Sequence, residues 1–162
     1  MLRKTSSLIA FLLISSSVVM GQAEWNEAIR QQIEQTWEAY NQAFIAKDYD
    51  KIRDLVQVPF FRWSEGETAL WQSPDDVIKF YRGHREPLDA RGYKTSRGDL
   101  SEARISLLSP TRALFSLRYR RYKADGSLLE EGAAIYLMSN ASGKWKIQGI
   151  MSQDPAEMGK VH

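Results

Sequence analysis

The first half of the chain carries apolar residues at helical spacing. Five of them follow one another at intervals of four, four, three and four residues: Ile29, Ile33, Trp37, Tyr40 and Phe44. Polar side chains fill the intervening positions, so this period predicts one long amphipathic helix over residues 24–47. Asp48 then suits the N-cap of a short second helix over residues 49–56, which Pro59 would follow.

Two aromatic segments, residues 60–63 and 68–71, flank a short polar turn in the middle of the chain. This arrangement is typical of a β-hairpin. Ser73, Pro74 and two aspartates then mark a helix start, because serine caps, proline suits the first helical position and aspartates favour the positive end of the helix dipole. We expect this third helix to end within residues 87–92.

The second half of the chain alternates apolar and polar residues with the period of β-strands. The alternation predicts strands over residues 93–107, with an interruption near Gly98, and over 111–123, 128–139 and 144–151. Helices that precede antiparallel strands in this way predict an α+β domain, with the helices on one face of the sheet. Long strands make a sheet curl, so the long helix and the two shorter ones should pack on a strongly curved, mostly antiparallel sheet that forms a cone.

The N-terminus has the pattern of an export signal. Arg3 and Lys4 precede an apolar run over residues 8–20, and small residues follow, with Ala23 at a suitable cleavage position. The run contains three serines and is shorter than the roughly 20 apolar residues that a membrane-spanning helix needs. We therefore expect a signal peptide over residues 1–23, export to the periplasm or the medium, and no membrane association after cleavage.

Cleavage would leave one domain at residues 24–154 and a disordered tail at 155–162. The chain has 22 basic and 20 acidic residues, and losing the two basic residues of the signal would leave 20 of each. A neutral domain lacks the basic surface of a nucleic-acid-binding protein, so no nucleic-acid partner is expected and the cationic run over 118–123 is a solvated or dimer-facing stripe. Without cysteines or a histidine pair at ligand spacing, we expect no disulfide, no metal and no other cofactor.

The order of these elements resembles the nuclear-transport-factor-2-like (NTF2-like) superfamily, which includes SnoaL-like polyketide cyclases and ketosteroid isomerases. The resemblance lies in the long first helix, the helix break at residues 46–52, the strand at 118–126 and the final strand at 143–147. Residues 58–92 resemble an uncharacterised bacterial branch of the superfamily, here in an exported form. The resemblance implies a cone-shaped, cystatin-like α+β fold with an apolar pocket between helices and sheet, commonly assembled as a homodimer through the outer sheet face.

Aromatic side chains with polar tips are the candidates for lining such a pocket. They provide apolar walls with a few hydrogen-bonding groups, which is typical of small-molecule sites. The candidate ligand-binding residues are Trp63, Trp71, Tyr81, Tyr119 and Tyr136. The alternative for each of them is ordinary packing in the core, which is where we expect Trp37 and Trp145.

His84 is the candidate general base, because the only other histidine is the C-terminal His162. It follows Tyr81 by three residues, on the same face of the third helix, and Tyr40 on the long helix is the candidate acid. Isomerases of the superfamily combine an aspartate base with a tyrosine and a protonated acid, and no such pair of acids can be placed in this chain. The alternative for His84 is a surface position in a polar run.

Three functions stay open at this point. The first is an exported domain that binds a small apolar molecule in an aromatic-lined pocket and forms a homodimer. The second is an isomerase or cyclase that uses His84 and Tyr40. The third is a non-catalytic module that binds a protein partner. An open cavity beside His84 would favour the first two, and an exposed apolar sheet face in a monomer would favour the third.

Overall fold

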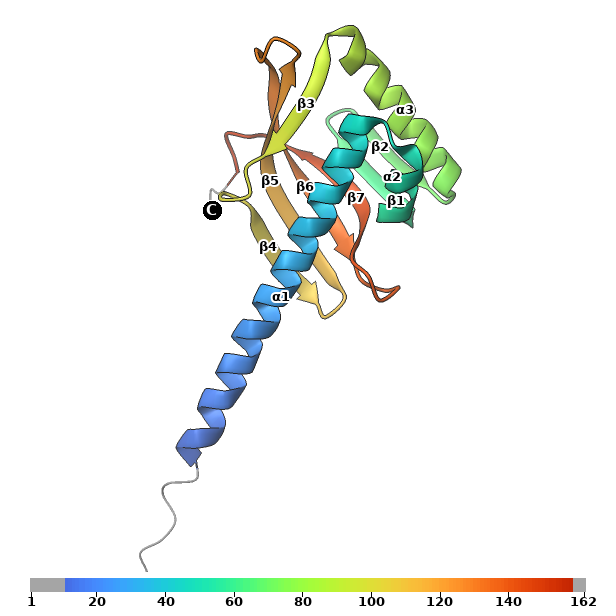
Figure 1. Ribbon diagram of the computed structural model, residues 1–162. Coiled ribbons are helices and arrows are strands. Elements are labelled where there is room, and N and C mark those ends of the chain that lie inside the picture. The colour runs from blue at the N-terminus through green and yellow to red at the C-terminus, as the bar shows by residue number, and fades with distance from the viewer. Residues whose placement is uncertain (1–10, 159–162) are drawn as a thin grey trace, which may run out of the picture. The chain divides into compact units, whose positions relative to one another are not determined.

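The computed structural model describes residues 11–158, with side chains from residue 27 onward (Figure 1). Its three helices are α1 (Phe11–Ala46), α2 (Tyr49–Leu55) and α3 (Pro74–Ala90). Helix α1 passes through the boundary between two compact units, which meet between Gln32 and Ile33. Residues 1–10 of the expected signal peptide and 159–162 of the expected tail lie outside the described residues. None of the described helices is both long and apolar enough to cross a membrane.

The second unit contains a seven-stranded sheet with the order β2-β1-β7-β6-β5-β3, and β4 pairs with β5 as well. The strands are β1 (Val56–Ser64), β2 (Glu67–Trp71), β3 (Tyr93–Gly98), β4 (Arg104–Ser109), β5 (Arg112–Lys123), β6 (Leu128–Ser139) and β7 (Lys146–Gln153). Residues 33–46 of α1 cross one face of this sheet, where α2 and α3 also lie (Figure 1). The predicted class, α+β with helices on a curved and mostly antiparallel sheet, is therefore confirmed.

Local sequence signals account for the helix ends. The backbone N–H of Lys51 donates to the Asp48 carboxylate at 3.0 Å, and that of Asp76 donates to the Ser73 hydroxyl at 3.3 Å, so both predicted N-caps are present. Helix α2 ends one residue earlier than expected, because the chain is already extended at Val56, where β1 begins.

The interruption expected near Gly98 is the end of β3. A Cβ atom at Gly98 would lie 2.2 Å from the ring of Trp37 in α1, so only glycine lets helix and strand approach this closely. The Ser96 hydroxyl in β3 donates to the Asn41 side-chain oxygen at 2.6 Å, and the Asn41 amide donates to the Ser96 carbonyl at 3.2 Å. These contacts fix the C-terminal half of α1 against β3, and Trp37 lies in the core as expected.

The parallel pairing of β1 with β7 was not predicted from the sequence. Other strand pairs in the sheet are antiparallel, but Arg62 in β1 lies beside Ile150 in β7 in parallel register. This pairing joins the β1–β2 hairpin to the main sheet. It therefore brings one face of β1 to the same side of the sheet as the helices.

Candidate functional site

A cavity of about 70 Å³ lies in the second unit, between α1, α3 and the inner face of the sheet. Tyr40 from α1 and Tyr81 and His84 from α3 form its helical side. Tyr119 from β5 and Tyr136 from β6 form part of its sheet side. We call it the Tyr81 cavity. It brings together these five candidates from the sequence, although they come from four different elements.

The two candidate tryptophans lie elsewhere. Trp63 is 58% exposed and does not line the Tyr81 cavity. Its neighbour Arg62 lines the cavity instead, because successive residues of a strand point to opposite faces. Trp71 does not line the cavity either. Its ring stacks on that of Phe80, a lining residue, with ring centroids 4.7 Å apart.

The hydroxyl of Tyr81 is the least satisfied polar group at the site. Tyr81 is 1% exposed, and within the part of the chain that the structure describes its hydroxyl makes no hydrogen bond of normal length. It interacts instead with the hydroxyl of Tyr40, which lies beyond that length. Its ring lies 5.7 Å from that of Tyr40, centroid to centroid. Burial raises the pKa of both phenols, so both keep their protons at neutral pH and can donate a hydrogen bond.

His84 is partly buried and lies against aromatic rings. Its imidazole stacks on Phe80, with ring centroids 5.8 Å apart and planes inclined by 23°. Burial, followed by the positive charges of Arg121 and Arg62, lowers the pKa of His84 to about 4. At neutral pH the imidazole is therefore uncharged, with one nitrogen that donates and one that accepts a hydrogen bond.

Two arginines, Arg62 and Arg121, line the cavity and were not candidates from the sequence. Their side chains are only 15% and 14% exposed. The guanidinium of Arg62 lies 5.1 Å from the centroid of the Phe80 ring, and that of Arg121 lies 4.8 Å from the centroid of Tyr119. Each charge is thus held over an aromatic ring that itself lines the cavity.

The carboxylates that balance these arginines stand outside the lining. Glu130 pairs with Arg121 and also with Arg91, whose guanidinium lies 2.6 Å from the Glu130 carboxylate. Glu67 approaches Arg62 only to 3.5 Å and is mostly exposed. The signal for Arg121 was present in the sequence, since alternation along the strand places it on the face of Tyr119 and opposite Arg120.

Tyr119 depends on a glycine in the neighbouring strand. Gly132 in β6 is its cross-strand partner, and a Cβ atom there would lie 2.5 Å from the Tyr119 hydroxyl oxygen. The phenol ring therefore lies over the backbone of β6, where any other residue would place a side chain. This position of the ring also sets the position of the Arg121 guanidinium above it.

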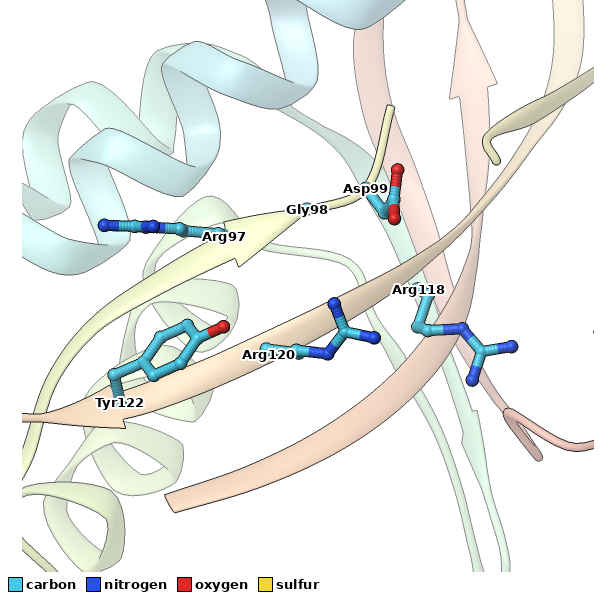
Figure 2. A pocket seen from close by; sticks show the side chains of 6 residues that line it. All are labelled: Arg97, Gly98, Asp99, Arg118, Arg120 and Tyr122. Atoms are coloured by element: carbon cyan, nitrogen blue, oxygen red, sulfur yellow. The ribbon is translucent and has the colours of Figure 1, made fainter. Parts of the chain in front are cut away.

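A second hollow, of about 250 Å³, lies on β3 and β5 and is lined by Arg97, Gly98, Asp99, Arg118, Arg120 and Tyr122 (Figure 2). Two of its arginines already share a carboxylate, since Glu131 lies 3.0 Å from Arg118 and 2.5 Å from Arg120. The hollow is charged and has few apolar walls, so it is the weaker candidate. Among the side chains that the structure describes, no group of three histidines or acids could hold a metal ion.

Comparison with known proteins agrees with this architecture. An NTF2-like protein of unknown function from Shewanella oneidensis has 16% identity and a TM-score of 0.60, over 76% of this chain and 98% of its own. A cystatin-like protein of unknown function from Nostoc punctiforme has 12% identity and a TM-score of 0.62, over 78% and 91% of the two chains. A ketosteroid isomerase-like protein from Erwinia carotovora has 16% identity and a TM-score of 0.53, over 75% and 92%.

At such identities the likeness shows the fold alone. No curated protein matches the chain. The family described as NTF2-like protein (DUF6841) matches residues 26–155, which include every residue of the Tyr81 cavity. The resemblance to the NTF2-like superfamily is therefore confirmed, and the chain belongs to this NTF2-like family.

Proposed function

We propose that this protein is an exported NTF2-like domain that binds a small molecule in the Tyr81 cavity. The observation that carries the proposal is the hydroxyl of Tyr81, which is buried beside the cavity and makes no hydrogen bond of normal length among the described residues. An unsatisfied buried donor costs about 1–3 kcal/mol of stability. A bound ligand with a hydrogen-bond acceptor would remove that cost, which explains why a phenol rather than a phenylalanine suits this position.

The size of the cavity restricts the ligand. Pockets for drug-sized molecules have volumes of about 300–1,000 Å³, whereas the Tyr81 cavity has about 70 Å³. A smaller void of about 30 Å³ shares Tyr40, Tyr119 and Tyr136 with it and extends towards Asn41 and Ser96. The ligand that fits this space has only a few non-hydrogen atoms.

Binding is favoured over catalysis by the properties of His84. A general base works best when its pKa lies near the working pH. The pKa of His84 is lowered to about 4, so the imidazole accepts a proton only weakly at neutral pH. Tyr40 has a raised pKa and holds its proton strongly. The two residues suit hydrogen bonding to a ligand better than proton transfer, which makes the isomerase or cyclase function the second choice.

A cavity-filling variant tests the binding proposal. Ala134 lines the cavity from β6, and Ala134→Leu adds three carbons to that wall. Fragments of up to about eight non-hydrogen atoms would be screened by 1H–15N NMR, and we expect shifts at α3 and β6 in the wild type that disappear in Ala134→Leu. Ile135→Leu, on the opposite face of the same strand, is the matched control. Absence of any fragment bound in this cavity would refute the proposal.

We also propose that the protein forms a homodimer through the outer face of its sheet. Phe61 lies opposite Leu70 across the β1–β2 hairpin, so the two share a face with Trp63. Trp63 and Leu70 are 58% and 57% exposed. Met151, the neighbour of Trp63 in β7, extends this apolar face into the main sheet. Apolar residues exposed side by side in this way are typical of an interface.

Export is proposed on the basis of the N-terminal pattern described above. The protein would act in the periplasm or outside the cell, without residues 1–23. The intact mass of protein recovered from the envelope or medium of a producing bacterium tests this directly. We expect the mass of a chain that begins near Glu24, and an uncleaved chain would contradict the proposal.

A further inference from the structure

Two cationic side chains converge on the Tyr81 cavity from strands that are not neighbours. Arg62 comes from β1 and Arg121 from β5, and β7 and β6 lie between them in the sheet. Each guanidinium is held over a ring of the cavity wall, Phe80 on one side and Tyr119 on the other. The convergence therefore follows from the curvature of the sheet together with specific ring contacts.

The charges around the cavity do not cancel. Its lining contains two arginines and no aspartate or glutamate. One carboxylate, Glu130, pairs with both Arg121 and Arg91, while the pair of Arg62 with the mostly exposed Glu67 is long, at 3.5 Å. The pKa of His84 reflects the same excess of positive charge, because Arg121 and Arg62 lower it by more than Glu130 and Glu67 raise it. The side chains that line the cavity therefore carry an excess of positive charge.

Donors also outnumber acceptors at the site. Among the described residues the Tyr81 hydroxyl makes no hydrogen bond of normal length and can donate one to a ligand, and the two guanidiniums offer further N–H groups. The rest of the lining contains hydrocarbon side chains, with Phe44, Ala134 and Ile150 among them, beside further tyrosines, His84 and Ser152. A ligand that satisfies both parts needs acceptor oxygens at one end and hydrocarbon at the other.

We infer that the Tyr81 cavity binds a short-chain carboxylate, with its charged end at Arg62 and Arg121 and its hydrocarbon against the aromatic and aliphatic wall. The inference rests on the proposed function and specifies its ligand class. Inorganic phosphate or sulfate fits less well, because it carries no hydrocarbon to pack against Phe44 and Ile150. The volume of about 70 Å³ limits the ligand to a chain of a few carbons.

The test compares an acid with its own amide. Sodium propionate, sodium butyrate, propionamide and sodium phosphate are titrated into the purified protein, and dissociation constants are taken from 1H–15N shifts at α3 and β6. We expect propionate and butyrate to bind, with propionamide at least about ten-fold weaker, since hydrogen bonds to charged groups are roughly twice as strong as neutral ones.

Three arginine variants test whether Arg62 and Arg121 bind the charged end of the ligand. Arg121→Gln and Arg62→Gln should each weaken propionate by at least about ten-fold and leave propionamide unchanged. Arg120→Gln is the matched control, because Arg120 precedes Arg121 on β5, faces the other side and pairs with Glu131. Glu130 keeps Arg91 as a partner in Arg121→Gln, so no carboxylate is stranded. Among the described residues Arg62 forms its ion pair with exposed Glu67, which gives a second variant whose folding is independent of that cluster.

The outcomes separate the inference from the proposed function. The inference of a carboxylate ligand would be overturned if propionate and propionamide bind with equal affinity, or if both glutamine variants still bind propionate. In either case the proposal of small-molecule binding in the cavity would stand. Phosphate binding more tightly than either acid would overturn it as well. If Ala134→Leu abolishes the binding of none of the probes, the inference of a carboxylate ligand is refuted. If the fragment screen is negative as well, the proposal that the cavity binds a small molecule is also refuted.

Discussion

Arg85 offers the sharpest test of how the helices are held together. It lies in α3 and is 5% exposed. Its Nη1 donates to the carbonyls of Phe44 and Ile45, the latter at 3.2 Å, and its Nε donates to Asp89 at 2.7 Å. The guanidinium also lies 4.3 Å from the ring centroid of Tyr93. One side chain thus caps the C-terminal carbonyls of α1 from another helix.

The expected loss of stability in Arg85→Met depends on which hydrogen-bonding groups lose their partner. Asp89 retains Lys47 at 2.6 Å, so its carboxylate keeps a partner. The carbonyls of Phe44 and Ile45 lose a charged donor, and each hydrogen bond to a charged group contributes about 1.5–3 kcal/mol. Two such bonds give an expected loss of about 3 to 6 kcal/mol in the free energy of unfolding. For a domain of this size that corresponds to a decrease in Tm of about 10–20 °C.

Urea unfolding followed by tryptophan fluorescence measures the change, with thermal circular dichroism as the second readout. Arg82→Met is the control, because Arg82 lies on the same helix, is exposed and contacts only the ring of Tyr49 among the contacts described, at 4.1 Å. We expect it to cost less than about 1 kcal/mol. The capping role would be refuted if the free energy of unfolding of Arg85→Met lies within about 1 kcal/mol of the wild-type value. It would also be refuted if Arg85→Met is no less stable than Arg82→Met.

The remaining predictions concern protonation and assembly. NMR titration should give His84 a pKa of about 4, and Arg121→Gln should raise it, because a positive neighbour is removed; an unchanged pKa would contradict the positive cavity. Since the unfolded chain takes up this proton near pH 6.5 and the folded chain only near pH 4, the stability from neutral His84 is complete above pH 6.5 and is lost as the pH falls towards 4. His84→Gln should therefore weaken the pH dependence of urea unfolding in that range. Trp63→Asp should convert a dimer to a monomer in light scattering, whereas Leu128→Asp, equally exposed beyond the β5–β6 turn, should not; a monomeric wild type would rule out the dimer.

Local signals in the sequence account for most of the elements. The strand at 128–139 has the predicted bounds, and Asp48 and Ser73 cap their helices as expected. These features depend on residues close together in the chain, so periodicity and capping chemistry suffice to predict them. Helix α1 differs in that it begins at Phe11 and so includes part of the expected signal peptide.

The parts of the site that were missed depend on contacts between distant segments. Both faces of β1 carry aromatic residues, Phe60 on the face of Arg62 and Phe61 on the face of Trp63, so alternation alone does not say which face is inside. Only the parallel pairing with β7 decides this, and it turns Arg62 rather than Trp63 towards the helices. Tyr40, Tyr81, His84, Tyr119 and Tyr136 were candidates because of their residue types, and the structure brings them to one cavity.

Gly132 has a consequence for how the ligand class of this protein could change. A methyl group at this position would collide with the Tyr119 hydroxyl and tilt the ring away from β6. The guanidinium of Arg121 rests on that ring, so the charge would move as well, although neither its own residue nor any lining residue had been altered. The position of the charge at the cavity thus depends on Gly132, which has no side chain and does not itself line the cavity. Engineering this domain towards neutral ligands could begin at Gly132 rather than at the arginines.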